Sequence, residues 1–274
     1  MTGVQTCALP IFQEILKVTI LKSPIRNSYN HTYPNQKYEL SDILNDIIYV
    51  LKSGISWRNI RSTIKWQSLV FHFNKLRDHD IFKISLKKLL RKYKKDIKME
   101  DIIYLTDTSF IKNNIGISHL GRNPCFKNKN CFKLSLLTDL CGIPMDILVD
   151  SGSIQEKVYM DKHIKYAVRN KSHKRTTLMA DKGYDSNPTR KKLLENNIKP
   201  IIPFNKRNTK DETKIRYLNE TENKQYKKRI KIENTFSWIK KHKRIAEVNE
   251  KSYISYLNFV YLAVCLIIFK RLYP

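Results

Sequence analysis

The sequence contains little glycine, proline or cysteine, and each shortage excludes a class of protein. Seven glycines and nine prolines in 274 residues are too few for a collagen-like or low-complexity chain. Five cysteines at this length do not form a disulfide framework, so we expect reduced thiols and a cytoplasmic protein. The N-terminal residues contain no basic segment followed by an apolar one, so the sequence does not predict a secretory signal. With 41% apolar residues, the chain is expected to fold into one or two globular domains.

Acidic residues are also scarce. There are 25 of them against 52 basic residues, which gives a formal net charge of +27. Such a charge attracts polyanions, and counterion release from nucleic acid drives binding without sequence preference. Part of the excess can reflect codons rich in A and T, because Lys, Asn and Ile are all abundant. A membrane surface is the lesser alternative, so nucleic acid is the expected partner.

Three cysteines close together raise the question of a zinc site. Cys125, Cys131 and Cys141 follow His119, with five and nine residues between successive cysteines. These intervals do not match the Cys-x2-Cys pairs of structural zinc sites. We therefore expect ordinary thiols here rather than a zinc centre.

The N-terminal region is expected to contribute little to the fold. Residues 1–11 (MTGVQTCALPI) resemble the translation of a common sequencing adaptor, so we expect them not to belong to the natural protein. Residues 12–40 contain two prolines and several asparagines and predict an arm.

Residues 41–98 predict a small all-helical domain. Ser41 is the expected N-cap of a first helix, which ends before Gly54, and apolar residues at helical spacing predict two more helices, the last over about 80–93. Three short helices suit a helix-turn-helix-like DNA-binding module, and an ordinary helical subdomain is equally compatible. The basic run at residues 87–98 is either a solvated linker or a strip that contacts phosphates.

From residue 99 to 274 the pattern predicts an α/β domain with a mixed sheet flanked by helices. Strands are expected over 102–111, 132–139, 144–149, 176–180 and 199–204, with helices over 155–168, 188–196 and 220–243. The uncharged stretch 253–269 is at the lower limit for a transmembrane span. Burial in the core explains it without a membrane, so no membrane partner is expected.

Three acids stand at positions where a carboxylate needs a partner. Asp107 lies inside an apolar strand, Asp181 closes another, and Glu233 lies among apolar residues of the long predicted helix. Buried acids are paired, hydrogen-bonded or metal-bound, and an all-oxygen set suits Mg²⁺ or Mn²⁺. Two such ions about 4 Å apart could clamp a phosphodiester displacement. Other nearby acids more often serve as turn or strand-end residues: Asp139, Asp146, Asp150 and Asp185.

The helix predicted over 220–243 carries a spaced polar set. Tyr226, Arg229, Glu233 and Lys240 are separated by three, four and seven residues, which at 3.6 residues per turn places them along one face. An acid for a metal and two cations in line suit the handling of phosphate, although a solvated face is also compatible.

The Tyr-x2-Arg-x3-Glu-x6-Lys pattern resembles the signature of the DDE transposases of bacterial insertion sequences, most of all the IS5-like group and its IS4 relatives. TDTS around Asp107, KLSLLTDLCGIP at 133–144, ADKGYDS at 180–186 and KPIIP at 199–203 extend the resemblance. So does LNDIIYVLKSGISWRNI at 44–60, so that it covers roughly residues 40–265. GRNPCFKNKN at 121–130 departs from the glycine- and serine-rich loop common in the group.

The resemblance implies an RNase H-like catalytic domain. Asp107, Asp181 and Glu233 would form a triad that binds two Mg²⁺ or Mn²⁺ ions. Arg229 and Lys240 would hold DNA phosphates, with Tyr226 as a helper close to the active site. The implied activity is cleavage of double-stranded DNA at terminal inverted repeats and transfer of the freed 3′-OH into target DNA. A homodimer or larger assembly on DNA, in the cytoplasm or nucleoid, would accompany it.

Two alternatives remain compatible with the residues. The chain could be a DNA-binding protein derived from an inactive or domesticated transposase, which the altered N-terminus favours and the preserved triad opposes. It could also be an RNase H-like nuclease that cleaves without joining.

Overall fold

The computed structural model describes residues 8–29, 37–96, 102–113, 115, 121–124, 127–170, 175–208, 215–246, 248 and 250–274. Its contacts divide the chain into two compact units. Unit 1 comprises Met1–Ile97, Lys112–Ser118 and Trp238–Pro274, and unit 2 comprises Lys98–Ile111 and His119–Ser237. The predicted boundary at residue 98 lies beside the first division. The last 37 residues, however, belong with the N-terminal helices and not with the predicted C-terminal domain.

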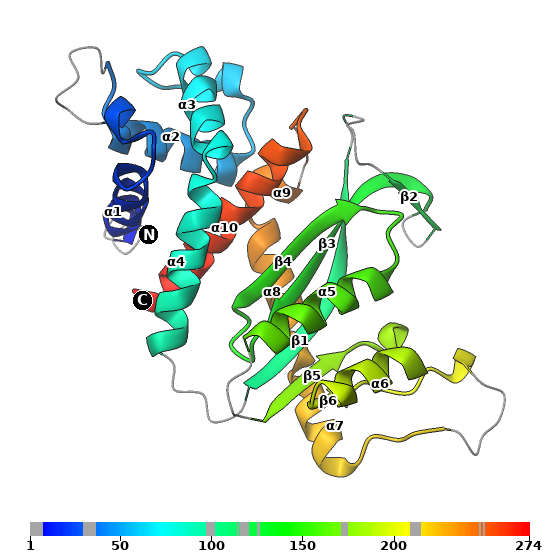
Figure 1. Ribbon diagram of the computed structural model, residues 1–274. Helices are drawn as coiled ribbons and strands as arrows, with labels where there is room; N and C mark the ends of the chain where they lie inside the picture. Colours follow the sequence, from blue (N-terminus) through cyan, green and yellow to red (C-terminus); the bar gives the residue numbers. More distant parts are fainter. Residues whose placement is uncertain are drawn as a thin grey trace. The chain divides into compact units, whose positions relative to one another are not determined.

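Unit 2 is built on a six-stranded mixed sheet (Figure 1). The strand order is β2-β3-β1-β5-β6, and β4 also pairs with β3. The pairs β1–β5 and β5–β6 are parallel, whereas β2–β3 and β3–β4 are antiparallel. The strands are β1 (Ile102–Lys112), β2 (Gly121–Asn123), β3 (Lys129–Thr138), β4 (Pro144–Ser151), β5 (Thr176–Ala180) and β6 (Ile198–Ile201).

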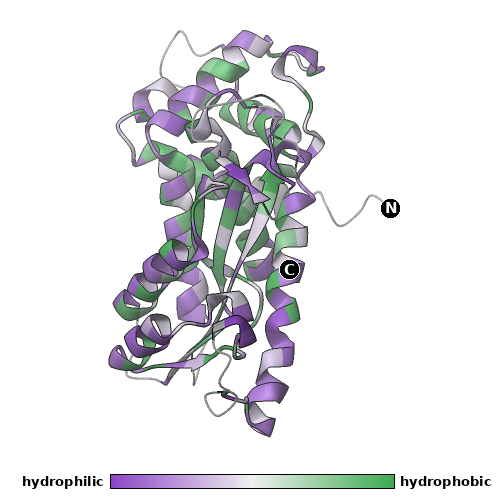
Figure 2. Cartoon of the chain, turned by 90° about the vertical axis from the view of Figure 1, so that its right-hand side faces the viewer, coloured by the Kyte–Doolittle hydropathy of each residue, from purple (hydrophilic) through white to green (hydrophobic). Residues whose placement is uncertain are grey.

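The centre of the sheet forms the core of unit 2. Every residue of β3 from Cys131 to Thr138 is buried, and so are Leu178, Met179 and Ala180 of β5. Figure 2 shows hydrophobic residues concentrated inside the protein and hydrophilic ones on the outer turns of helices. A strand buried on both faces is expected to be apolar, as LMA of β5 is, whereas β3 also buries Lys133, Ser135 and Thr138.

Helices cover both faces of this sheet, as predicted. Figures 1 and 2 place α5 (Glu156–Arg169) and α6 (Asn187–Glu195) on one face and α8 (Ile230–Lys240) on the other. Thr235 of α8 donates a hydrogen bond to the carbonyl of Gly142, which fixes the helix against the β3–β4 turn. The mixed α/β fold with flanking helices is therefore confirmed. The short strand β2 was not predicted. It lies within residues 121–130, the segment that differs from the glycine- and serine-rich loop common in the family.

The prediction of one continuous helix over 220–243 is wrong. The segment is divided into α7 (Glu220–Tyr226), a 3₁₀ turn η7 (Lys227–Arg229) and α8, followed by α9 (Lys243–Ala246). A 3₁₀ turn has three residues per turn, so the constant period of 3.6 does not hold across it. Tyr226, Arg229, Glu233 and Lys240 were predicted to lie along one face of a single helix. Because the 3₁₀ turn interrupts that helix, they do not form one continuous row.

Unit 1 is helical, and it begins earlier than predicted. Its helices are α1 (Ala8–Leu21), α2 (Leu40–Ser53), α3 (Trp66–Asp78), α4 (Ile81–Asp96), α9 and α10 (Tyr253–Leu272). The arm expected over 12–40 contains most of α1, because Phe12, Leu16 and Ile20 recur at a spacing of four and are fully buried. The predicted N-cap Ser41 lies inside α2, which begins at Leu40, whereas Gly54 ends that helix in the left-handed conformation, as expected.

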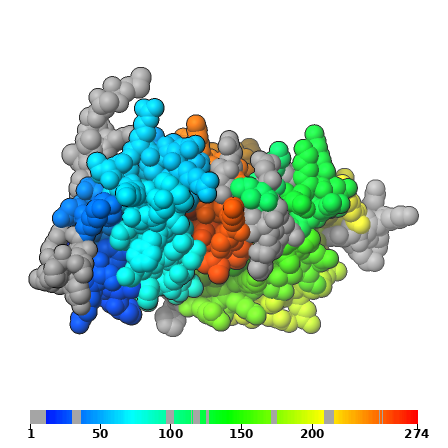
Figure 3. Space-filling view, turned by 90° about the horizontal axis from the view of Figure 1, so that it is seen from above, coloured from blue at the N-terminus to red at the C-terminus, as the bar shows by residue number. Residues whose placement is uncertain are grey.

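The apolar C-terminal stretch forms α10. This helix is long and apolar enough to cross a membrane by length and composition, and 67% of its most apolar window is buried in the protein. It packs on α4, and in Figure 3 the N-terminal helices lie directly beside this C-terminal segment. Burial among helices accounts for its composition, in agreement with the expectation from sequence.

Unit 1 also encloses a charged residue, Arg244 of α9, which is 2% exposed. Its Nε donates to Glu250 over 2.7 Å, and Nη1 donates to the carbonyl of Ile55 over 3.0 Å. The guanidinium lies over the rings of Trp57 and Phe259. Arg244 thus connects the C-terminal part of the unit to the segment that follows α2.

Replacement of Arg244 is expected to destabilise unit 1. Arg244→Met leaves Glu250 buried without its cation and should lower the free energy of unfolding by about 3–5 kcal/mol. Lys251→Met, at an exposed position next to Glu250, is the control and should change it by less than about 0.5 kcal/mol. Urea unfolding of the three proteins provides the measurement. Equal stabilities would contradict a structural role for Arg244.

Candidate active site

Asp107 and Asp181 are brought together by neighbouring parallel strands. Thr106 of β1 is the register partner of Ala180 of β5, and each aspartate directly follows its member of this pair. Because paired strands lie about 4.8 Å apart and equivalent positions face the same side, the two carboxylates approach each other. Asp181 also caps η4 (Lys182–Tyr184) by accepting from the Gly183 N–H. Two of the three predicted acids therefore share one site.

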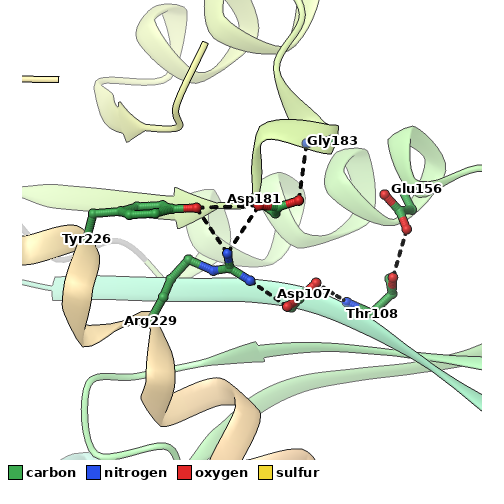
Figure 4. A network of polar contacts seen from close by, with 7 residues as sticks. All are labelled: Asp107, Thr108, Glu156, Asp181, Gly183, Tyr226 and Arg229. Carbon is green, nitrogen blue, oxygen red and sulfur yellow. Dashed lines mark hydrogen bonds and ion pairs between the residues drawn. The ribbon is translucent and has the colours of Figure 1, made fainter. Parts of the chain in front are cut away.

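Arg229 of η7 bridges these two carboxylates (Figure 4). Its Nη2 donates to Oδ2 of Asp107 over 2.6 Å, and Nη1 lies 3.4 Å from Oδ1 of Asp181. The Arg229 side chain is 13% exposed and that of Asp107 22%, whereas Asp181 is more open at 45%. The contact with Asp107 is thus a partly buried, charge-assisted pair, and the contact with Asp181 is looser.

Tyr226 completes the bridge. Its hydroxyl accepts a hydrogen bond of 3.0 Å from Arg229 Nη1 and lies 3.5 Å from Oδ1 of Asp181. The 3₁₀ turn explains how both side chains reach the same carboxylate, since residues three apart are eclipsed at three residues per turn. Tyr226 and Arg229 were predicted to act together, and they do lie together. Tyr226 was expected close to the active site, whereas the contacts of Arg229 with both aspartates were not predicted.

Burial and charge act in opposite directions on Asp107. Burial raises the pKa of its carboxyl above the ordinary value, and the Arg229 guanidinium and the N–H of Thr108 oppose this shift. Asp181 raises the same pKa further by repulsion. Arg229 is the cation named among the groups that oppose this upward shift of the Asp107 pKa.

Three further residues at this site were not found from the sequence. Thr108 donates a hydrogen bond of 2.9 Å to Glu156, the first residue of α5. Burial, followed by the charges of Glu156 and Asp107, raises the pKa of Tyr184 well above its ordinary value. An acid at the start of a predicted helix was the only sequence signal for Glu156, and it is a common feature of helices.

Glu233 and Lys240 are not part of this network. Glu233 lies in the first turn of α8, is exposed, and makes no hydrogen bond or ion pair with a described residue. Lys240 is the last residue of α8 and belongs to unit 1, where burial lowers the pKa of its amine. Across the described part of the chain, no three His, Cys, Asp or Glu side chains are arranged to hold a metal ion.

The competing acids are all engaged in local structure. Oδ1 of Asp139 accepts from the N–H groups of Cys141 and Ile143 in the β3–β4 turn. Asp146 shares a hydrogen bond with the buried His163, and Asp150 and Asp185 form ion pairs with Lys162 and Arg190. Neither Cys131 nor Cys141 is in a disulfide, and Cys125 and His119 lie outside the described residues. All four acids therefore have a partner in the local structure, and of these only Asp139 is held by the backbone of a turn.

The Asp107–Asp181 pair fits a divalent cation on two observations. Its donors are carboxylate oxygens, which hard ions such as Mg²⁺ and Mn²⁺ prefer. A positive group, the Arg229 guanidinium, already lies between them and stands in for such an ion. The Nε of Arg229 is buried without an acceptor among the described residues, so the guanidinium is incompletely satisfied where it lies.

Comparison with known proteins bears on this geometry. The family model described as "Transposase DDE domain" matches residues 84–269. Among curated proteins, no sequence matches this chain. Of the solved structures, a cryo-EM structure of the piggyBac transposase synaptic complex with hairpin DNA is similar, with a TM-score of 0.59 and 10% sequence identity. The match covers 96% of this chain and 74% of that one, which shows a shared fold.

Removal of the bridging cation should give a pH-dependent loss of stability. In Arg229→Met the carboxylates face each other uncompensated, so the pKa of Asp107 rises further above its unfolded value. When the folded pKa of a carboxyl is above its unfolded pKa, the free energy of unfolding falls as pH rises from the unfolded to the folded value. Below both pKa values the group is protonated in both states and has no effect on stability. We expect Arg229→Met to be less stable than the parent by about 1–2 kcal/mol near pH 8, after allowance for solvent screening, and by much less near pH 4.

Urea unfolding at the two pH values checks this expectation, with Lys227→Met as an exposed control from the same 3₁₀ turn. A destabilisation that is the same at both pH values would show that Arg229 acts through packing and not through the carboxylates.

Proposed function

Since the chain belongs to the family of the transposase DDE domain, we propose that it cuts DNA at the ends of an insertion sequence and joins the freed 3′-OH to target DNA. The observation that carries this proposal is the pair of aspartates that follow register-matched residues of two parallel strands, with the Arg229 guanidinium between them. Within the family we assign it to the IS5-like, IS4-related group, on the sequence patterns around Asp107, Asp181 and the Tyr-Arg-Glu-Lys residues.

Asp107, Asp181 and Glu233 are the proposed catalytic acids. The aspartates are already adjacent, and Glu233 lies one helical turn after Arg229, which contacts both of them. An exposed carboxylate in that position has no protein partner to lose when it turns toward the pair. Two divalent ions, Mg²⁺ or Mn²⁺, would activate the attacking oxygen and stabilise the leaving oxygen when bound.

Arg229, Lys240 and Tyr226 are the proposed phosphate-binding residues. Arginine forms paired hydrogen bonds with phosphate as readily as with carboxylate. Arg229 can therefore exchange its carboxylate partners for a DNA phosphate, and Tyr226, which already contacts it, would keep its position. The net charge of +27 supports double-stranded DNA as the partner, and a homodimer or larger assembly would hold two ends together.

Loss of a catalytic acid should abolish cleavage but not DNA binding. Because replacing even the partners of metal ligands costs about 10–100-fold, Asp107→Asn, Asp181→Asn and Glu233→Gln should each reduce Mg²⁺-dependent nicking of terminal inverted repeats more than about a hundredfold. Asp150→Asn removes an acid that is paired with Lys162 and serves as the control.

Gel analysis of cleaved and joined products separates the possible activities. Cleavage by Asp107→Asn at the parent's rate would contradict the site assignment. Salt-dependent binding without cleavage would indicate a DNA-binding protein, and cleavage without joining would indicate a nuclease.

A stripe of cations on α4 is expected to contact DNA phosphates. Lys87, Arg91 and Lys95 are exposed and follow each other at intervals of four, so they lie along one face of the helix. Replacing all three by Gln should weaken binding to DNA of any sequence and reduce the slope of log K against log salt by about 0.9 per lost contact. Fluorescence anisotropy at several salt concentrations measures this slope. An unchanged slope would mean that the run is a solvated surface.

A further inference from the structure

Asp107 lies just beyond the point where its strand loses a neighbour. The ladder between β1 and β5 ends at the pair Thr106–Ala180, which is also the end of β5. Asp107 is thus the first residue of β1 after this ladder, and it has no partner in β5. Contacts other than this ladder must therefore fix the direction of its carboxylate.

Thr108, the next residue of the strand, is attached to α5. Its hydroxyl donates a hydrogen bond of 2.9 Å to Oε1 of Glu156, the first residue of that helix. Its backbone N–H donates to Oδ1 of Asp107 over 2.8 Å. Glu156 is therefore connected to the carboxylate of Asp107 through a single residue (Figure 4).

Asp107 and Thr108 are held from opposite faces of the sheet. Successive side chains of a strand point to opposite faces. Asp107 contacts Arg229, which directly precedes α8, and Thr108 contacts Glu156 of α5. Helices α8 and α5 cover opposite faces in Figure 1. A rotation of β1 about its own axis would break both contacts, so the bond between Glu156 and Thr108 fixes the direction in which Asp107 points.

A second buried group adjoins Thr108. Tyr184 of η4 is 4% exposed, and burial raises its pKa well above the ordinary value, whereas a hydrogen bond with Thr108 opposes this shift. Helix α5 contacts η4, and η4 directly follows Asp181. Packing around Thr108 therefore connects the elements that carry both aspartates.

The acceptor oxygen of Glu156, and not its charge, is the property that this contact uses. An acid in the first turn of a helix is favoured by the helix dipole, which accounts for the charge without reference to the site. The hydrogen bond accounts for the direction of the side chain. Because the Thr108 hydroxyl is the donor, the carbonyl oxygen of a glutamine at position 156 would accept the same bond.

We propose that Glu156 is a positioning residue of the active site: through the Thr108 hydroxyl it holds β1 so that the carboxylate of Asp107 stays directed toward that of Asp181. This inference rests on the proposed function, in which Asp107 is a catalytic acid. Misplacement of a reacting group by about 1 Å can slow a reaction about a hundredfold. Loss of the anchor should therefore lower kcat for cleavage and leave the binding of DNA nearly unchanged.

Cleavage kinetics of the full chain provide the first test. Thr108→Val removes the donor and Glu156→Leu removes the acceptor, so each should lower kcat about 10–100-fold with little change in KM for DNA. The double variant should be no slower than the slower single one, because both changes remove the same interaction. Thr108→Ser and Glu156→Gln keep the bond and should cleave like the parent. Glu195→Leu, at an exposed acid paired with Lys191 on α6, is the matched control.

The pKa of Asp107, followed by carboxyl NMR of the full chain, tests the anchor without reliance on activity. Burial and Asp181 raise this pKa, and the Arg229 guanidinium and the Thr108 N–H lower it. If Thr108→Val releases the strand, the N–H moves off the carboxylate and the pKa of Asp107 should rise further. Thr108→Ser should return it to the parent's value. A loss of global stability alone would not move this pKa.

The outcomes separate this inference from the proposed function. Slow cleavage and a raised Asp107 pKa in Thr108→Val, both restored by Thr108→Ser, support positioning. A parent-like pKa or a parent-like kcat in Thr108→Val overturns it and leaves the proposed function standing. If the parent itself does not cleave terminal inverted repeats, the proposed function fails, and the pKa of Asp107 still decides whether the anchor exists.

A second pair of variants decides if Thr108→Val does not fold, as judged by circular dichroism. Slow cleavage by Glu156→Leu with parent-like cleavage by Glu156→Gln supports the anchor. Equal rates in these two variants overturn it, because the hydrogen bond is kept in only one of them.

Discussion

The site depends on one electrostatic constraint: two carboxylates, one of them largely buried, must share a cation. Arg229 meets this constraint by bridging Asp107 and Asp181. Repulsion between carboxylates at this separation would otherwise favour protonation of one of them. The same constraint makes the site suitable for divalent ions, because whatever replaces the guanidinium must also carry positive charge. Arg229 lies between the carboxylates in this structure, and under the proposed function it would bind a DNA phosphate once metal ions take its place.

The fold supplies this geometry with few elements. Parallel pairing of β1 and β5 aligns the two aspartates in register, and η7 turns Tyr226 and Arg229 onto the same carboxylate. A continuous α-helix would place residues three apart at azimuths that differ by about 60°, whereas a 3₁₀ turn superimposes them. The 3₁₀ turn thus aligns the two groups more closely than an α-helix would.

Much of this could be predicted from the sequence, and the failures have physical causes. Strand ends and helix ranges follow from local apolar periodicity, and so Asp107 and Asp181 were recognisable as acids in need of a partner. The phase of the residues after Lys227 was not predictable, because no glycine or proline marks the 3₁₀ turn. Glu156 was missed because its proximity to Thr108 arises from tertiary packing of α5. The helix α1 was missed because prolines and asparagines further along suggested an arm, although Phe12, Leu16 and Ile20 carry the spacing of a buried helix.

The central claim is that the aspartate pair is a metal site now held by an arginine. The most direct test is a crystal structure of the protein grown with Mn²⁺, with anomalous diffraction used to locate the metal. The account predicts anomalous peaks against the carboxylates of Asp107 and Asp181, with the Arg229 guanidinium withdrawn from between them. Arg229 still bridging both aspartates at saturating Mn²⁺, with no anomalous peak beside them, would contradict it.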